Sequence, residues 1–263
     1  MTTKDVIWRG ASKRFFLERA YALGYVALST SGDEEKYLGR AIRRTLGKDP
    51  ISNGRLLDIG CADARLTRAI LTPFKHVTLY EPNPLLFSLA TSNLEDCGKT
   101  IEARNREFPD PAPPDETFDV ILASHMLYHV HRDQWAGYFR AAIKLLKRRG
   151  LLMLVLWNKH SEARAFAETI DPSRWVCCAE DLTDPSSAIL KQVGLSITTI
   201  ERTHPFIKVF SLEMAKVVTD FLLGHARRTR KSDQTRIAQF EKKLLVGGIG
   251  NSQSIIVLRR SGE

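Results

Sequence analysis

The 263-residue sequence has few cysteines and no long apolar run. Its four cysteines, Cys61, Cys97, Cys177 and Cys178, lack the paired spacing of a zinc site, so we expect neither a disulfide framework nor a bound metal. The longest early apolar run, residues 20–28, is too short to span a bilayer and begins too late for a signal sequence. These absences predict a cytoplasmic protein without a membrane segment.

An acidic excess is also absent. The chain holds 39 Lys and Arg against 30 Asp and Glu, and its net charge of +9 would favour phosphate-bearing partners if it were gathered on one face. The densest cluster, residues 225–231, contains Arg227, Arg228, Arg230 and Lys231. It has two interpretations, a nucleic-acid surface or a solvated loop, and runs of charge are more often the second. Nothing in the sequence bears on oligomeric state.

With 43% hydrophobic residues, the chain can bury one sizeable core, so one domain with appendages suffices. Apolar residues at helical spacing predict helices over residues 12–27 and 34–46. The loop between them ends in Asp33, which we expect to cap the second helix. We assign residues 1–50 to an N-terminal helical cap and lid, and residues 51–263 to the main domain.

From Arg55 onward, short apolar runs alternate with amphipathic segments. The predicted strands are 55–59, 76–80, 100–103, 118–123 and 151–157, and the predicted helices are 64–72, 84–97 and 132–147. Parallel neighbours need such crossovers, so we expect an α/β fold with a largely parallel sheet and helices on both faces. Strands at 195–200 and 254–258 should complete the sheet as an antiparallel pair, with helical insertions at 160–194 and 211–245.

The most informative stretch is residues 56–66, a buried strand that runs into a tight turn and then a helix. At Gly60 the chain must turn sharply and let a cofactor approach the backbone, which a Cβ would obstruct. Two of the usual three alternating glycines are replaced by Ala62 and Ala64, which suits a cofactor without a pyrophosphate. Glu81 ends the second apolar run, where a carboxylate can accept hydrogen bonds from both ribose hydroxyls.

Asp58, Gly60, Glu81 and the strand at 118–123 together resemble the class I S-adenosylmethionine-dependent methyltransferases, over most of residues 56–157. The resemblance implies a Rossmann-like seven-stranded sheet with one antiparallel strand, and S-adenosylmethionine as cofactor. It also places the Gly60 turn under the methionine part and Glu81 on the ribose. For Asp58 the alternatives are contact with a cofactor-bound water or amine, and a purely organising role in the turn.

The adenine contact is less defined, because many relatives place an Asp after the third strand and this chain does not. Asn105 or Glu107 would substitute, or both are surface residues. The full set of expected cofactor contacts is Asp58, Ile59, Gly60, Ala62, Glu81, Pro82, Asn105, Glu107, Ser124 and His125.

Residues 124–130 follow the fourth predicted strand, at the edge where a switch-point pocket and the transferable methyl would lie. This segment, with residues 139–146, 180–195 and 250–257, is similar to the histamine N-methyltransferase group. The likeness implies an acceptor pocket lined by His125, Tyr128, His129, Trp157 and Asn251. In this chain His125 replaces an amide and His129 replaces a tyrosine. The acid that would hold the amine has three candidates, Asp33, Glu34 and Glu35.

Methyl transfer from a sulfonium is an in-line displacement, so the protein chiefly supplies alignment and a dry pocket. An amine must react in its neutral form, and His125 or His129 would take the proton. Each histidine is alternatively a hydrogen-bonded wall residue, and Tyr128, the third expected catalytic residue, is alternatively part of the core. We therefore expect N-methylation of a small amine or heteroaromatic compound. RNA methylation and a non-catalytic cofactor-binding regulator are the alternatives.

Overall fold

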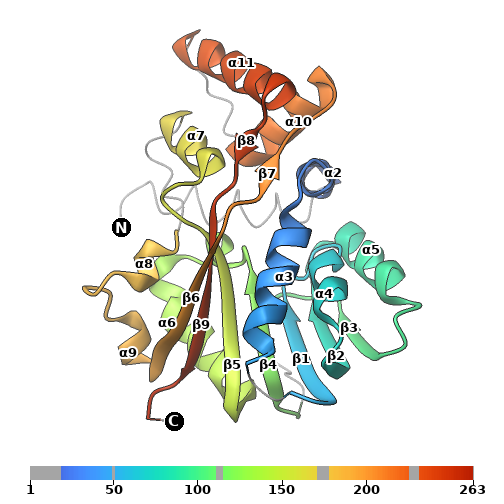
Figure 1. Cartoon of the computed structure of the whole chain (residues 1–263), viewed down its shortest axis with the longest axis vertical. Helices are drawn as coiled ribbons and strands as arrows, with labels where there is room; N and C mark the ends of the chain where they lie inside the picture. The colour runs from blue at the N-terminus through green and yellow to red at the C-terminus, as the bar shows by residue number, and fades with distance from the viewer. Residues whose placement is uncertain (1–18, 49–50, 111–114, 171–177, 225–230, 263) are drawn as a thin grey trace.

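The computed structural model describes residues 19–48, 51–110, 115–170, 178–224 and 231–262. Its centre is a seven-stranded sheet with the order β3-β2-β1-β4-β5-β9-β6 (Figure 1). The strands are β1 (Gly54–Ile59), β2 (Phe74–Tyr80), β3 (Thr100–Arg104), β4 (Phe118–Ser124), β5 (Leu146–Trp157), β6 (Leu195–Thr203) and β9 (Gln253–Arg260). In this sheet β9 runs opposite to the other six strands and pairs antiparallel with both β5 and β6. The predicted fold, with its one antiparallel strand, is confirmed.

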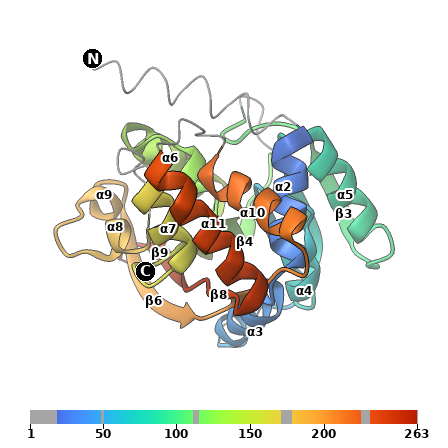
Figure 2. The same ribbon diagram turned by 90° about the horizontal axis from the view of Figure 1, so that it is seen from above.

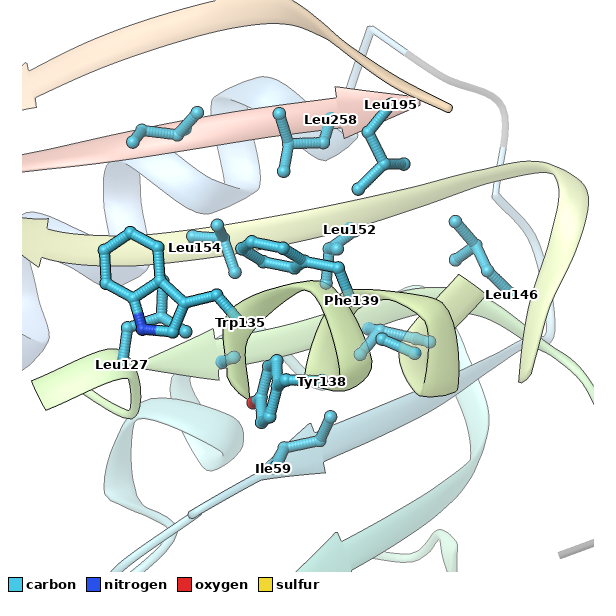
Figure 3. Close-up of a cluster of buried hydrophobic side chains, with 14 of the residues drawn as sticks. Ile59, Leu127, Trp135, Tyr138, Phe139, Leu146, Leu152, Leu154, Leu195 and Leu258 are labelled. Carbon is cyan, nitrogen blue, oxygen red and sulfur yellow. The ribbon is translucent and has the colours of Figure 1, made fainter. Parts of the chain in front are cut away.

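The central strands are buried on both faces, which explains why they are continuous apolar runs rather than alternating ones. One face packs on α3 (Glu34–Leu46), α4 (Arg65–Ile70) and α5 (Pro84–Leu94). The other packs on α6 (Trp135–Leu145), α8 (Glu180–Thr183) and α9 (Ile189–Gln192), where Trp135 and Phe139 contact alternate leucines of β5 (Figure 3). Two hydrophobic cores therefore hold the sheet rigid between them.

A separate layer covers one end of the sheet. It comprises α2 (Arg19–Thr30), α7 (Glu162–Ile170), α10 (Leu212–Leu223), α11 (Lys231–Val246) and a small sheet of β7 (Phe206–Ile207) and β8 (Ile249–Gly250) (Figures 1 and 2). Its own core contains Phe166 stacked on Phe240, with ring centroids 3.7 Å apart. The layer lies at the carboxyl ends of the parallel strands, so it closes over the edge where a ligand is expected.

Several boundaries differ from the predicted ones. The helix predicted over 132–147 ends at Leu145, and β5 begins at Leu146 because that side chain packs in the core. The described residues of the predicted helical insertion at 160–194 contain α7 and the short helices α8 and α9, and the strands β7 and β8 were not predicted. Helix α2 continues to Thr30, into the predicted loop.

The predicted cap at Asp33 is wrong. Asp33 stands at the N-cap position of α3, but its side chain forms no capping hydrogen bond. Its carboxylate instead accepts a hydrogen bond from the backbone nitrogen of Phe206 at 2.7 Å. Asp33 therefore ties the start of α3 to β7. Within the described residues, no helix combines the length and the apolar character that a bilayer crossing requires.

Candidate active site

The Gly60 turn lies between β1 and α4, at the carboxyl edge of the sheet. Gly60 has a φ of +72°, and a Cβ there would lie 2.5 Å from the Sδ atom of Met126. The backbone nitrogens of Gly60 and Cys61 both donate to the carbonyl oxygen of Tyr80, at 2.8 and 3.1 Å. The left-handed backbone and the nearby Met126 side chain thus both favour glycine at this position. The reason expected from the sequence was a different one, the approach of a cofactor.

Ala62 and Ala64 both have left-handed backbone conformations. Their φ values are +50° and +56°, in a region that alanine rarely adopts. Although these two positions carry alanine, the turn therefore uses backbone conformations that favour glycine.

Glu81, at the end of β2, faces this turn. Its carboxylate accepts hydrogen bonds from the backbone nitrogens of Ala62 at 2.9 Å and Asn83 at 2.8 Å. Burial raises the pKa of Glu81 to about 7, although both hydrogen bonds act in the opposite direction. Each carboxylate oxygen has a second lone pair available. The turn and the predicted ribose acid are therefore brought together.

Asp58 lies deeper, in β1. The hydroxyl of Thr67 donates to one carboxylate oxygen, Oδ2, while the buried Oδ1 atom has no hydrogen-bond partner. Burial raises the pKa of Asp58 to about 7. An unpartnered buried acceptor beside a cofactor turn fits a cationic donor, such as the ammonium group of S-adenosylmethionine. The residues present therefore fit this cofactor.

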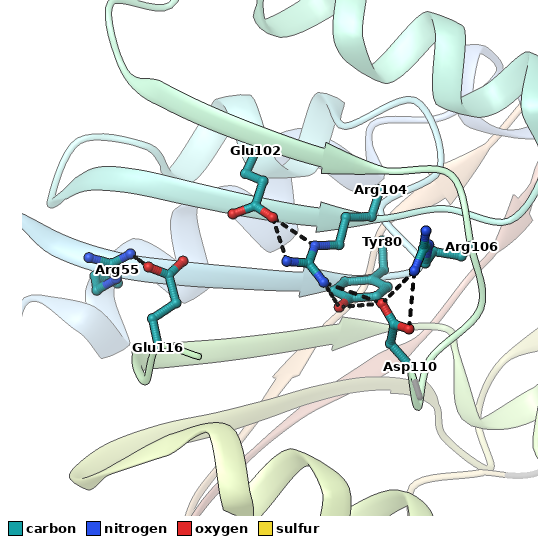
Figure 4. A network of polar contacts seen from close by, with 7 residues as sticks. All are labelled: Arg55, Tyr80, Glu102, Arg104, Arg106, Asp110 and Glu116. Atoms are coloured by element: carbon teal, nitrogen blue, oxygen red, sulfur yellow. Dashed lines mark hydrogen bonds and ion pairs between the residues drawn. The ribbon is translucent and has the colours of Figure 1, made fainter. Parts of the chain in front are cut away.

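The segment after β3 is held by a polar network (Figure 4). Buried Asp110 accepts a hydrogen bond from Tyr80 at 3.1 Å and pairs with Arg104 at 3.3 Å and Arg106 at 3.4 Å. Next to it, the Asn105 amide donates to the carbonyl oxygens of Glu81 at 2.8 Å and Pro82 at 3.2 Å. The network fixes the loop beside the predicted ribose acid.

The surroundings of three predicted cofactor contacts, Asn105, Glu107 and Ile59, limit what each could offer to a cofactor. Asn105 is committed through its amide nitrogen to the backbone of residues 81–82, which leaves its carbonyl oxygen for adenine. Glu107 is exposed. The side chain of Ile59 is fully buried in the hydrophobic core, so a cofactor contact at this position would come from its backbone.

On the acceptor side, Glu34 is the central acid. It begins α3, and its Oε2 atom accepts hydrogen bonds from the side-chain amides of Asn251, at 2.9 Å, and Gln253. Its Oε1 atom lies 3.3 Å from Nε2 of His125. Burial alone would raise the pKa of Glu34, but His125 and the two amides outweigh it and lower the pKa. Of the three acids that the sequence left open, Glu34 is the one that contacts His125, Asn251 and Gln253.

His125 and Tyr128 form the wall opposite Glu34. His125 follows β4 with a left-handed φ of +55°, a strained conformation for a non-glycine residue. Its Nδ1 atom lies 2.9 Å from the Tyr128 hydroxyl, which also accepts the backbone N–H of Trp157. The Tyr128 ring stacks on Trp157 with centroids 4.9 Å apart. The structure therefore gathers His125, Tyr128, Trp157 and Asn251 around Glu34.

His129 lies at the side of this group, where its ring packs edge-on against Tyr128 with centroids 6.3 Å apart. Its Nε2 atom is 3.5 Å from the hydroxyl of Tyr21 in α2. The sequence left Glu34 as one of three candidate acids, and it gave no indication that Gln253, Tyr21 or Tyr25 lies nearby. None of these residues belongs to a local motif, since each reaches the site only through long-range packing.

Some residues that the sequence analysis named lie outside the described part of the chain. They are Cys177 and, in the basic cluster, Arg227, Arg228 and Arg230. In the described part of the chain, no group of three or more His, Cys, Asp or Glu side chains is arranged to hold a metal ion.

Comparison with known proteins identifies the family of the chain. Residues 32–198 match the family described as "Methyltransferase domain". The chain is 32% identical over 127 residues to a ubiquinone biosynthesis O-methyltransferase of Cereibacter sphaeroides, covering 48% of this chain and 50% of that protein. It is 26% identical over 134 residues to the protein of the same name from a Methylobacterium species, covering 51% and 52%. The match thus spans about half the length of these curated relatives.

Solved structures show the same fold. A SAM-dependent methyltransferase of Leishmania major superposes with a TM-score of 0.59 at 12% identity, covering 96% of this chain and 83% of that one. The mycolic acid cyclopropane synthase CmaA1, solved with S-adenosylhomocysteine, gives a TM-score of 0.52 at 15% identity, covering 84% and 83%. The likeness to histamine N-methyltransferase stays a prediction. The chain belongs to the methyltransferase domain family and has the class I fold, whose cofactor is S-adenosylmethionine.

Proposed function

We propose that this protein transfers the methyl group of S-adenosylmethionine to a nitrogen atom of a small amine or heteroaromatic compound. The observation that carries the proposal is the half-buried Glu34 carboxylate, which His125, Asn251 and Gln253 hold at the acceptor side of the site. The lowered pKa of Glu34 keeps this carboxylate ionised at neutral pH.

An ionised carboxylate favours a nitrogen acceptor over a hydroxyl. During methyl transfer the N–C bond forms, the S–C bond breaks, and its electron pair goes to sulfur, so positive charge moves from sulfur to nitrogen. A fixed negative charge stabilises that cation. A phenol would have to lose its proton to become a strong nucleophile, and Glu34 would repel the resulting anion.

The remaining residues have roles that follow from their positions. Asn251, with Gln253, orients Glu34. Tyr128 and Trp157 offer stacked rings, which suit a planar acceptor. His125 and His129 are the two candidates to receive the proton that the acceptor nitrogen loses. On the cofactor side, Asp58, Gly60, Ala62, Glu81, Pro82 and Ser124, with the backbone of Ile59, would hold S-adenosylmethionine.

One observation favours a second function, O-methylation of a small molecule. The curated relatives are named O-methyltransferases. In this case the His125 and Glu34 pair, 3.3 Å apart, would act together as the base that removes the hydroxyl proton.

An acceptor screen with methyl-labelled S-adenosylmethionine tests the proposal. Purified full-length protein is offered separate pools of amines, nitrogen heteroaromatics, phenols and total RNA, and products are identified by mass spectrometry. We expect labelled N-methyl products. Label confined to phenols would establish the second function, and label confined to RNA, with activity falling steeply as salt is added, would refute both.

A further inference from the structure

Helix α2 covers the cofactor half of the site with one face. Ala22 packs against Ala62 of the Gly60 turn and against Leu86. Tyr21 and Tyr25 flank Ala22 and are one helical turn apart, so their side chains extend from the same face of the helix. Gly24 packs so closely on Phe221 of α10 that a Cβ would lie 2.7 Å from that side chain, and the rings of Tyr21 and Tyr25 also pack against Phe221. Helix α2 is thus held between α10 and the turn (Figure 2).

The two tyrosines lie near different acidic groups of the expected cofactor site, and the Tyr21 hydroxyl also lies 3.5 Å from Nε2 of His129. The charge of Glu81, the predicted ribose acid, is close enough to Tyr21 to help raise its pKa, after the larger effect of burial. The hydroxyl of Tyr25 donates to Asp63 of the Gly60 turn over a long 3.5 Å. Burial, then the charges of Asp63 and Glu34, raise the pKa of Tyr25. Tyr21 therefore lies at the ribose end, and Tyr25 at the methionine end beside the acceptor acid.

We propose that Tyr21 and Tyr25 are cofactor-binding residues, with the Tyr21 hydroxyl donating to the adenosyl part of S-adenosylmethionine and the Tyr25 hydroxyl donating to its methionine part. Both hydroxyls stay neutral at physiological pH, so each can serve as a donor. Their present hydrogen bonds, at 3.5 Å, are long enough to be exchanged for shorter ones to a ligand. The inference does not depend on the identity of the methyl acceptor.

Calorimetric binding of two ligands tests the assignment. S-adenosylhomocysteine contains both halves of the cofactor, whereas 5′-methylthioadenosine lacks the amino-acid part. Tyr21→Phe should weaken both ligands about three- to tenfold, the loss expected for one neutral hydrogen bond. Tyr25→Phe should weaken S-adenosylhomocysteine by a similar factor and leave 5′-methylthioadenosine unchanged. Phenylalanine keeps the ring packing against Phe221, and a thermal melt of each variant confirms that it folds.

Tyr37→Phe is the matched control, because Tyr37 lies on α3 and is 41% exposed. It should bind both ligands like the wild type. If Tyr21→Phe and Tyr25→Phe also bind like the wild type, or if the wild type binds neither ligand, the proposal is wrong. Equal weakening of both ligands by Tyr25→Phe would overturn its place at the methionine end. None of these outcomes involves the acceptor, so the nitrogen proposal stands or falls separately.

Discussion

The cofactor half and the acceptor half of the site are built in different ways. The cofactor half comes mainly from one continuous stretch, β1 to β2, in which Asp58, Gly60 and Glu81 lie within 24 residues of sequence. The acceptor half collects Glu34 from α3, His125 from the end of β4, Trp157 from β5 and Gln253 from β9. A local motif therefore supplies the predicted cofactor contacts, and long-range packing brings together the residues of the proposed acceptor half.

The largest expected effect is on the cofactor half. Gly60→Ala should destabilise the protein by about 3 kcal/mol, because it adds left-handed strain and a collision with Met126. It should also abolish binding of S-adenosylhomocysteine. Chemical denaturation and calorimetry measure the two effects. Gly98→Ala is the control, since Gly98 has a similar φ of +67° but no atom within 4 Å of its Cβ position. An equal loss of stability in both variants would show that Met126 plays no part.

The two raised carboxyl pKa values predict a pH dependence of stability whose sign is opposite to the one expected from Glu34, whose pKa is lowered. Below about pH 7 folded Glu81 and Asp58 hold protons that the unfolded chain releases near its ordinary values of 4.5 and 3.8. The free energy of unfolding should therefore fall as pH rises from about 4 to 7, by about 3 kcal/mol for Glu81. Glu81→Gln should remove that share, as seen in denaturation at pH 5 and pH 7.5.

The cofactor should respond to pH in the opposite direction. Its ribose hydroxyls and ammonium group favour ionised Glu81 and Asp58, so S-adenosylhomocysteine should bind more tightly as pH rises from 6 to 8. Affinity that is constant over this range would show that neither carboxylate meets the ligand.

On the acceptor side, Glu34→Gln should separate the two halves. It keeps the shape of the side chain and removes its charge, so turnover of a nitrogen acceptor should fall roughly thirtyfold, the equivalent of about 2 kcal/mol. Affinity for S-adenosylhomocysteine should be unchanged. The neighbouring exposed Glu35, changed in the same way, should have no effect. Loss of cofactor binding in Glu34→Gln would mean that the two halves are not independent.

The difference between the cofactor half and the acceptor half also explains which features could be predicted from the sequence. The sheet follows from apolar runs and crossover lengths, and the cofactor turn follows from Gly60 and Glu81, because in both cases the information is local. Glu34 has no such signal, since it is one of three acids near the start of a helix and only the distant Asn251 and Gln253 single it out. Likewise, nothing near Tyr21 in the sequence indicates that α2 lies on the turn.

The reason for Gly60 was also beyond sequence reasoning. A glycine in a turn indicates a positive φ, but the contact with Met126 joins positions 66 residues apart. In the same way Asp33 has the residue type of a helix cap, yet its carboxylate accepts a hydrogen bond from the backbone nitrogen of Phe206 in β7. Tertiary partners can therefore override a local preference that is correctly identified.

The smallest effect concerns the alanines of the turn. Ala64 has a left-handed φ of +56°, so Ala64→Gly relieves strain and loses one buried methyl, and these two changes nearly cancel. Ala69 lies in helix α4, where there is no left-handed strain to relieve, so Ala69→Gly should only destabilise the protein, by about 1 kcal/mol. Denaturation should therefore find Ala64→Gly more stable than Ala69→Gly by about 1 kcal/mol. Equal destabilisation would mean that the left-handed alanine carries no strain, and that the turn tolerates alanine as readily as glycine.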